Sequence, residues 1–305
     1  MAALDSTRPS VPKDDDAAIQ QRWEALTNVS FWRAKAADEA RHPATGAPLF
    51  TDPFSAAAAA RCVPRAAAAK LEDREPGAGV GLRVQWMGVR TAEIDARVLE
   101  AARGLVAVAA EGSSLQVVIL GAGLDARAWR LPWPRPPGGR AAVWEVDTAP
   151  ILALKAHALE GFAVTACERR EVACDLTNVS ALASGLAQAG HDAAVPTVWV
   201  LEGLIGYFTT EDGLQLLHAL AGLSAPGSRV VMTSPPSLKD KEEYEGRGIT
   251  LHHSTFEETE DTLARARRAG WQGVIVTAEE LLQRYGVERA QQLLLLTPAE
   301  AGGPA

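Results

Sequence analysis

Cysteine is scarce in this sequence of 305 residues. Its three cysteines, Cys62, Cys167 and Cys174, are odd in number and show no CxxC spacing, so they indicate neither a disulfide framework nor a zinc site. Thiols of this kind are typical of proteins in a reducing compartment. We therefore expect a cytoplasmic protein without a bound metal.

Long apolar runs and basic blocks are also missing. No stretch of 18 apolar residues occurs, and residues 1–18 lack the apolar core of a signal peptide. The net charge is −8, without a block of lysine and arginine. These absences argue against a membrane span, and against an anionic membrane surface or nucleic acid as a partner. They leave the oligomeric state open.

The stretch of residues 115–150 carries the strongest local pattern. The apolar run Val117–Leu120 predicts a buried strand, and Gly121 and Gly123 follow it directly. Two glycines one residue apart allow a tight turn and a close approach to a ligand, because neither carries a Cβ atom. Residues 125–130 predict a short helix, and residues 142–147 a second strand that ends on an acid. A strand, a glycine turn, a helix and a strand in this order are typical of a site for an adenosine cofactor.

The same pattern leaves the identity of that cofactor open. Gly121, Gly123 and Ala126 fit the G-x-G-x-x-[GA] fingerprint of NAD-binding proteins, in which an acid follows about 20 residues later. Here the spacing is longer: Asp147 lies 26 residues after Gly121, and Glu145 lies 24 residues after Gly121. A proline-rich segment inserted between helix and strand accounts for the extra length. An NAD(P)-dependent oxidoreductase is therefore one alternative.

Acidic residues end three consecutive predicted strands. They are Asp147, Asp175 and Glu202. Because ligands of an open α/β sheet bind beyond the carboxyl ends of its strands, these carboxylates are expected to face one ligand. S-adenosylmethionine has a cationic sulfonium and an amino group that suit carboxylates, whereas the pyrophosphate of NAD would be repelled. The acids therefore favour S-adenosylmethionine.

The order of the predicted elements indicates a single α/β domain. Three helices precede the first strand: one over residues 17–41, one over about 53–60 with Asp52 as its N-cap, and one over 82–110. The strands that follow alternate with helices, which is typical of a doubly wound, mostly parallel sheet with helices on both faces. We expect a domain over 17–297, made of a helical N-terminal part (17–112) and a Rossmann-like core (113–297) with a candidate lid at 234–256, between disordered tails at 1–16 and 298–305.

Four sequence motifs, in this order, resemble the leucine carboxyl methyltransferase-like family of S-adenosylmethionine-dependent methyltransferases. They are VILGAGLDAR at 118–127, WEVD at 144–147, CDL at 174–176 and LEGLIGYF at 201–208, and the resemblance extends from about Ala34 to Tyr285. It implies a class I methyltransferase fold with a seven-stranded sheet. The chain departs from the pattern at Ala92, where bacterial members often carry an arginine.

The resemblance also implies a set of cofactor-binding residues. Gly121 and Gly123 would lie beside the methionine part, Asp147 at the ribose, Asp175 and Leu176 at the adenine, Glu202 near the amino group, and Lys35 and Arg90 at a carboxylate.

The reaction expected from these residues is O-methylation of a small molecule. A carboxylate acceptor is ionised at neutral pH and needs no base, only a cation such as Lys35, Arg83 or Arg90. A hydroxyl acceptor needs help in losing its proton, for which Tyr207, His252 and His253 are the weak catalytic candidates. A protein C-terminus is a less favoured acceptor, and a family member that binds the cofactor without turnover is a further alternative.

Overall fold

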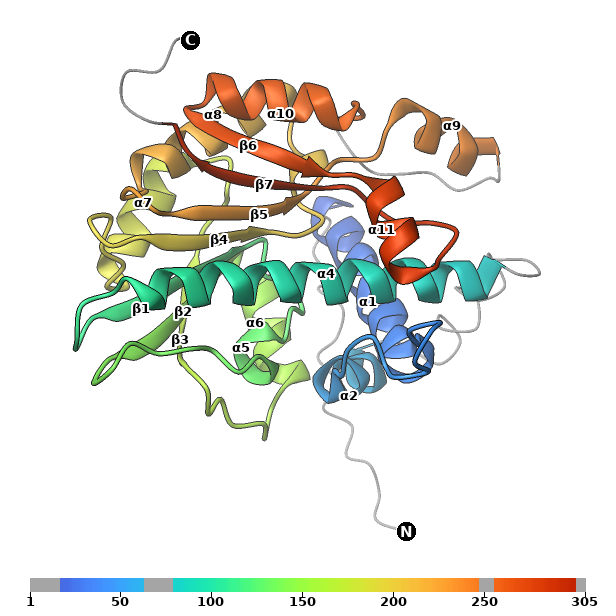
Figure 1. Ribbon diagram of the computed structural model, residues 1–305, viewed down its shortest axis with the longest axis horizontal. Helices are drawn as coiled ribbons and strands as arrows, with labels where there is room; N and C mark the ends of the chain where they lie inside the picture. Colours follow the sequence, from blue (N-terminus) through green and yellow to red (C-terminus); the bar gives the residue numbers. More distant parts are fainter. Residues whose placement is uncertain (1–16, 63–78, 247–254, 300–305) are drawn as a thin grey trace.

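A computed structural model describes residues 17–62, 79–246 and 255–299 of the chain (Figure 1). The predicted tail at 1–16, residues 300–305 of the tail predicted at 298–305, and the candidate residues His252 and His253 lie outside the described residues. Among the helices of the described part, none is both long enough and apolar enough to cross a membrane.

One seven-stranded sheet forms the centre of the protein (Figure 1). Its strands lie in the order β3-β2-β1-β4-β5-β7-β6, and β7 runs antiparallel to β5 and β6 while the other pairs are parallel. The strands are β1 (Ser114–Leu120), β2 (Arg140–Asp147), β3 (Glu168–Ala173), β4 (Thr197–Leu201), β5 (Arg229–Thr233), β6 (Trp271–Val276) and β7 (Leu293–Pro298). This is the predicted doubly wound, mostly parallel sheet. It places the acids that end β2, β3 and β4 along one edge, because the carboxyl ends of parallel strands point the same way.

Helices cover both faces of the sheet. They are α4 (Gly79–Ala107), α5 (Arg127–Arg130), α6 (Ala149–Ala158), α7 (Val179–Gln188), α8 (Thr210–Gly222), α10 (Thr259–Arg268) and α11 (Ala278–Tyr285). Side chains alternate along β1, so that Val117 and Ile119 pack with α4 and α6, whereas Val118 and Leu120 pack with α7, α8 and α10. The alternation of strand side chains therefore gives the domain two cores, one on each face.

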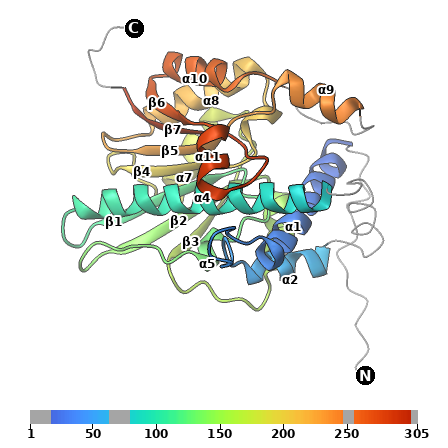
Figure 2. The same cartoon turned by 45° about the vertical axis from the view of Figure 1, so that its right-hand side comes forward.

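Residues 17–62 of the helical N-terminal part lie at the carboxyl edge of the sheet (Figure 2). Helix α1 (Ala17–Glu39) packs against α4 and against α2 (Pro53–Cys62), with a third core around Trp32, Phe50 and Met87. Asp52 caps α2, as the sequence predicts, by accepting a hydrogen bond of 2.8 Å from the Ser55 N–H. Figure 2 also shows α11 lying across α4, where Arg284 and Tyr285 hydrogen-bond to Glu93.

The segment expected to form a lid contains a helix, α9 (Leu238–Gly246). Where the described chain resumes, the Thr255 N–H donates to the carbonyl of Gly206 at 3.0 Å, so this segment is tied to the turn η1 (Ile205–Tyr207) after β4. At the other end of the domain, β7 continues through Pro298, and the Ala299 N–H donates to the carbonyl of Gly270. The sheet therefore extends past residue 297, where the sequence placed the end of the domain.

Candidate active site

The turn after β1 requires glycine at two positions. Gly121 and Gly123 have φ angles of +63° and +39°, in the left-handed region that favours glycine. A Cβ atom on Gly121 would lie 2.7 Å from Leu204 Cδ1, and one on Gly123 would lie 2.5 Å from Leu26 Cδ2. The turn is therefore enclosed by the segment after β4 and by helix α1.

Asp147 at the end of β2 is directly bonded to this turn. Its Oδ2 accepts a hydrogen bond of 2.9 Å from the Gly123 N–H, and its Oδ1 accepts one of 2.8 Å from the Thr148 N–H. The side chain is buried. The structure thus brings together the glycine turn and the strand-end acid that the sequence pairs as a ribose site.

Glu202, at the end of β4, lies among three arginines. Its Oε1 accepts a hydrogen bond of 2.6 Å from Arg33 Nη2 and lies 3.0 Å from Arg90 Nε, while its Oε2 accepts one of 2.5 Å from Arg127 Nη1. The side chain is 5% exposed. Burial alone would raise the pKa of Glu202, but the three guanidinium groups hold it well below its usual range. Glu202 is therefore a buried carboxylate that stays ionised.

Arg127 connects Glu202 to two further acids. Its side chain is fully buried, with Nε 2.7 Å from Asp95 Oδ1 and Nη1 also bonded to Asp125. Burial lowers the pKa of Arg127, but the surrounding carboxylates raise it well above its usual value. Arg130 pairs with Asp95 as well and lies 3.5 Å from Asp52. The result is a continuous web of arginines and carboxylates beneath helix α1.

Some donors in this web have no partner. Within the described part of the chain, Nε of Arg33 and Nη2 of Arg127 are buried and make no hydrogen bond, whereas Nε of Arg90 lies 3.0 Å from Glu202 Oε1. Burial lowers the pKa of Arg90, and the nearby carboxylate of Glu202 offsets only part of that effect. Because a buried unsatisfied donor costs free energy, these groups are suited to receive a further anion.

Lys35 is placed apart from Glu202. Its Nζ lies 2.7 Å from Glu39 of the same helix. Arg33, two residues earlier, reaches Glu202 instead, and sequence reasoning missed it. Arg33 follows Leu26 by seven residues, so both lie on the face of α1 that covers the glycine turn, and this helical spacing could have identified Arg33.

The remaining predicted residues differ in burial and in their contacts. Asp175 is exposed, and its Oδ1 accepts hydrogen bonds from Thr177 N and Oγ1, while Leu176 is buried in the core on the α7 side. Tyr207 is 41% exposed. Arg83 lies over the Trp86 ring, with 4.9 Å between its guanidinium carbon and the ring centroid.

A fully buried lysine beneath the glycine turn was also missed. Lys155 of α6 donates to the carbonyl of Ala122 at 3.2 Å, and its Nζ lies 2.8 Å from Glu145 Oε1. Glu145 is itself fully buried and receives Arg169 on its other oxygen. Glu145, considered above for its spacing to Gly121, is thus already held by two cations.

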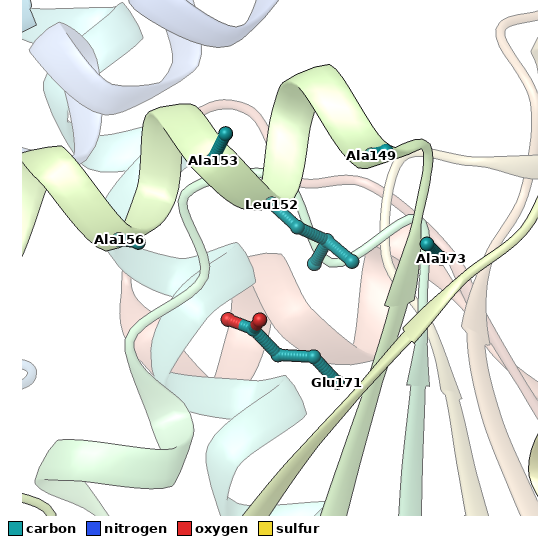
Figure 3. A pocket seen from close by; sticks show the side chains of 6 residues that line it. All are labelled: Ala149, Leu152, Ala153, Ala156, Glu171 and Ala173. Carbon is teal, nitrogen blue, oxygen red and sulfur yellow. The ribbon is translucent and has the colours of Figure 1, made fainter.

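A surface cavity of about 370 Å³ opens between α6 and β3 (Figure 3). It is lined by Ala149, Leu152, Ala153, Ala156, Glu171 and Ala173, and Figure 3 shows Leu152 and Glu171 directed into the space between helix and strand. Its lining contains none of the predicted site residues. Ala149 and Ala173 lie two residues from Asp147 and Asp175, so the cavity adjoins the strand ends without including their acids.

Comparison with known proteins adds the family. Residues 26–221 match the family described as leucine carboxyl methyltransferase. A putative S-adenosyl-L-methionine-dependent methyltransferase of Mycolicibacterium smegmatis is 33% identical over 88% of this chain and 92% of its own. Another of that description, from Frankia alni, is 34% identical over 90% of this chain and 89% of its own.

Among solved structures, a DUF574 family protein of Streptomyces avermitilis has a similar fold. The TM-score is 0.52, and the alignment covers 87% of this chain and 96% of that protein at 13% identity. These matches give no support to the oxidoreductase alternative.

Proposed function

This chain belongs to the leucine carboxyl methyltransferase family and is an S-adenosylmethionine-dependent methyltransferase; we propose that it methylates a carboxylate of a small molecule. The cluster of Arg33, Arg90 and Glu202 supports the placement of the cofactor, because it presents both charges that the amino-acid tail of S-adenosylmethionine requires. The choice of a carboxylate acceptor rests on the chemistry of the acceptor, because an ionised carboxylate needs no general base. A hydroxyl group is the alternative acceptor.

The residues of the site fit the cofactor. Its methionine part has a carboxylate and an ammonium group, and the buried arginines with unused donors suit the first while Glu202 suits the second. Such a tail would exchange the internal contacts between Glu202 and Arg33 for equivalent ones of its own. Asp147 at the glycine turn would hold the ribose hydroxyls, and Asp175 and Leu176 would lie at the adenine.

Little acid–base chemistry is required of the chain. When bound, S-adenosylmethionine supplies an activated sulfonium methyl group. The protein has to orient the acceptor in line with that group and exclude water. An ionised carboxylate needs no general base. Tyr207, the described residue among the three weak base candidates, is 41% exposed, which suits a carboxylate better than a hydroxyl acceptor.

The chemistry of the product tests the acceptor class. The protein is incubated with S-adenosylmethionine labelled in its methyl group, using small carboxylic acids and matched alcohols or phenols as acceptors. A methyl ester releases labelled methanol in mild base, whereas a methyl ether does not. We expect base-labile label and a rate that changes little between pH 6 and 9. Base-stable label, with a rate that rises with pH, would assign a hydroxyl acceptor and a general base.

Calorimetric titration tests the cofactor site. Wild type should bind S-adenosylmethionine and S-adenosylhomocysteine but not NADH, and Asp147→Ala should abolish binding of both. Asp261→Ala, which removes an exposed carboxylate on α10, is the matched control and should bind like wild type. Binding of NADH alone would refute the proposal. Cofactor binding without methylation of any acceptor class would indicate a member that does not turn over.

A further inference from the structure

We propose that Lys155 is a positioning residue that fixes the peptide between Ala122 and Gly123 and thereby sets the affinity for S-adenosylmethionine. The proposal rests on the placement of the cofactor at the glycine turn, as proposed above. It assigns a task to a side chain on α6 that does not belong to the predicted site.

Lys155 is fully buried, so its charge must be balanced inside the protein. Its Nζ lies 2.8 Å from Glu145 Oε1 and 5.6 Å from the centroid of the Trp129 ring, and it donates to the Ala122 carbonyl at 3.2 Å. Neutralising Glu145 is one explanation for a cation at this position. Holding the turn is another.

Arg169 separates these two explanations, because it already provides a cation for Glu145. Its Nε donates to Glu145 Oε2 at 2.7 Å, and its guanidinium carbon lies 4.4 Å from the centroid of the same Trp129 ring. Arg169 also pairs with Glu171 at the surface. Lys155 and Arg169 thus share a carboxylate and an aromatic ring, but of these two cations only Lys155 donates a hydrogen bond to the glycine turn.

The contact of Lys155 is to one end of a peptide whose other end is held by Asp147. The Ala122 carbonyl accepts from Lys155 Nζ and from the Asp125 N–H, while the N–H of the same peptide, that of Gly123, donates to Asp147 Oδ2. In a planar trans peptide these two groups point in opposite directions. Lys155 and Asp147 therefore grip the peptide from opposite sides.

A grip is needed here because the chain offers little resistance to rotation of this peptide. Gly121 and Gly123 flank Ala122, and glycine adopts positive and negative φ with similar ease. If Asp147 exchanges the Gly123 N–H for ribose hydroxyls, the hold on that side weakens. The bonds to the Ala122 carbonyl then keep the turn in its binding conformation, so less ordering is required when the cofactor binds.

The test compares Lys155→Met with Arg169→Met. Both variants remove one cation from Glu145 and the Trp129 ring, but only Lys155→Met removes a bond to the turn. We expect Lys155→Met to raise the Kd for S-adenosylmethionine and S-adenosylhomocysteine about tenfold, the loss expected for one charge-assisted hydrogen bond. Arg169→Met should change the Kd less than twofold. Hydrogen–deuterium exchange over residues 119–126 should accelerate in Lys155→Met alone.

Equal effects of the two substitutions on Kd and exchange, or an unchanged Kd in a folded Lys155→Met protein, would overturn the inference. If Lys155→Met does not fold, Glu145→Gln/Lys155→Met, which removes the buried carboxylate together with its lysine, carries the same test against Arg169→Met. Failure of wild type to bind S-adenosylmethionine would overturn the proposed function and this inference together. Binding by wild type with no effect of Lys155→Met overturns only the inference.

Discussion

Replacement of Arg33 by methionine should weaken cofactor binding through the amino-acid tail of the ligand. Arg33 Nη2 lies 2.6 Å from Glu202 Oε1, and its Nε is buried without a hydrogen-bond partner among the described residues. The pKa of Arg33 is raised, because the carboxylates of Glu202 and Asp125 outweigh the opposing effect of burial. The side chain therefore stays charged wherever the protein is folded, and it is positioned for a carboxylate.

The expected size follows from the bond that is lost. One hydrogen bond to a charged group contributes about 1.5–3 kcal/mol, which corresponds to a Kd for S-adenosylmethionine that rises about 10- to 150-fold. Part of this loss is offset, because Arg90 and Arg127 still surround Glu202. We therefore expect a rise near the lower end of the range.

Calorimetry with two ligands and two variants measures this effect. Lys35→Met is the matched control, because Lys35 lies on the same helix and pairs with Glu39. Arg33→Met should weaken S-adenosylmethionine and leave 5′-methylthioadenosine unchanged, because that ligand lacks the carboxylate and the ammonium group. If Lys35→Met weakens binding and Arg33→Met does not, the assignment of the carboxylate to Arg33 is refuted.

Two further predictions concern the glycine turn and the amino end of the sheet. Gly123→Ala should abolish cofactor binding, because its φ of +39° and the 2.5 Å approach of Leu26 both oppose a Cβ atom. Gly161→Ala is the control: its φ is +85° but the space around it is open, so this variant should lose stability and still bind the cofactor. Burial among Trp144 and Trp199 lowers the pKa of His191 to about 4. Because the pKa of a histidine in the unfolded chain is about 6.5, protons bind the unfolded chain first as the pH falls. The contribution of His191 to the free energy of unfolding is therefore complete above pH 6.5, and about 2 kcal/mol of it should be lost by pH 5. Urea unfolding at pH 7.5 and pH 5 should show a smaller pH dependence in His191→Gln than in wild type; an equal dependence would assign the effect to other groups.

The sequence predicted the sheet because its strands are apolar and end on glycine or acid. Val117–Leu120 and Thr197–Leu201 are buried on both faces, so periodicity and turn residues located them almost to the residue. The pairing of Gly123 with Asp147 followed from the same pattern. The antiparallel orientation of β7 could not be predicted in this way, because an apolar run does not indicate the direction of a strand in the sheet.

The arginine cluster was predicted only in part. The resemblance placed Arg90 at a carboxylate of the ligand, and in the structure it meets the buried carboxylate of Glu202. Arg33 and Lys35 are two residues apart on one helix, so their side chains point in different directions, and a local motif could not show which one faces the sheet. Lys155 was missed because a lysine on a helix is usually solvated, and only the tertiary packing of α6 buries it.

The web around Arg127 also links the folding of separate segments of the chain. The web comprises the helical N-terminal part, the turn after β1, helix α5 and the end of β4. Its members are Arg33, Asp52, Arg90, Asp95, Asp125, Arg127, Arg130 and Glu202. In each of these ion pairs except that of Arg127 with Asp125, the partners are distant in sequence. The cost of burying these charges is therefore balanced only when all of the segments have packed together. A chain that has formed its sheet but not docked α1 would bury Glu202 with fewer counter-charges. The charges that we propose to bind the zwitterionic tail of the cofactor thus also couple docking of the N-terminal helices to completion of the sheet.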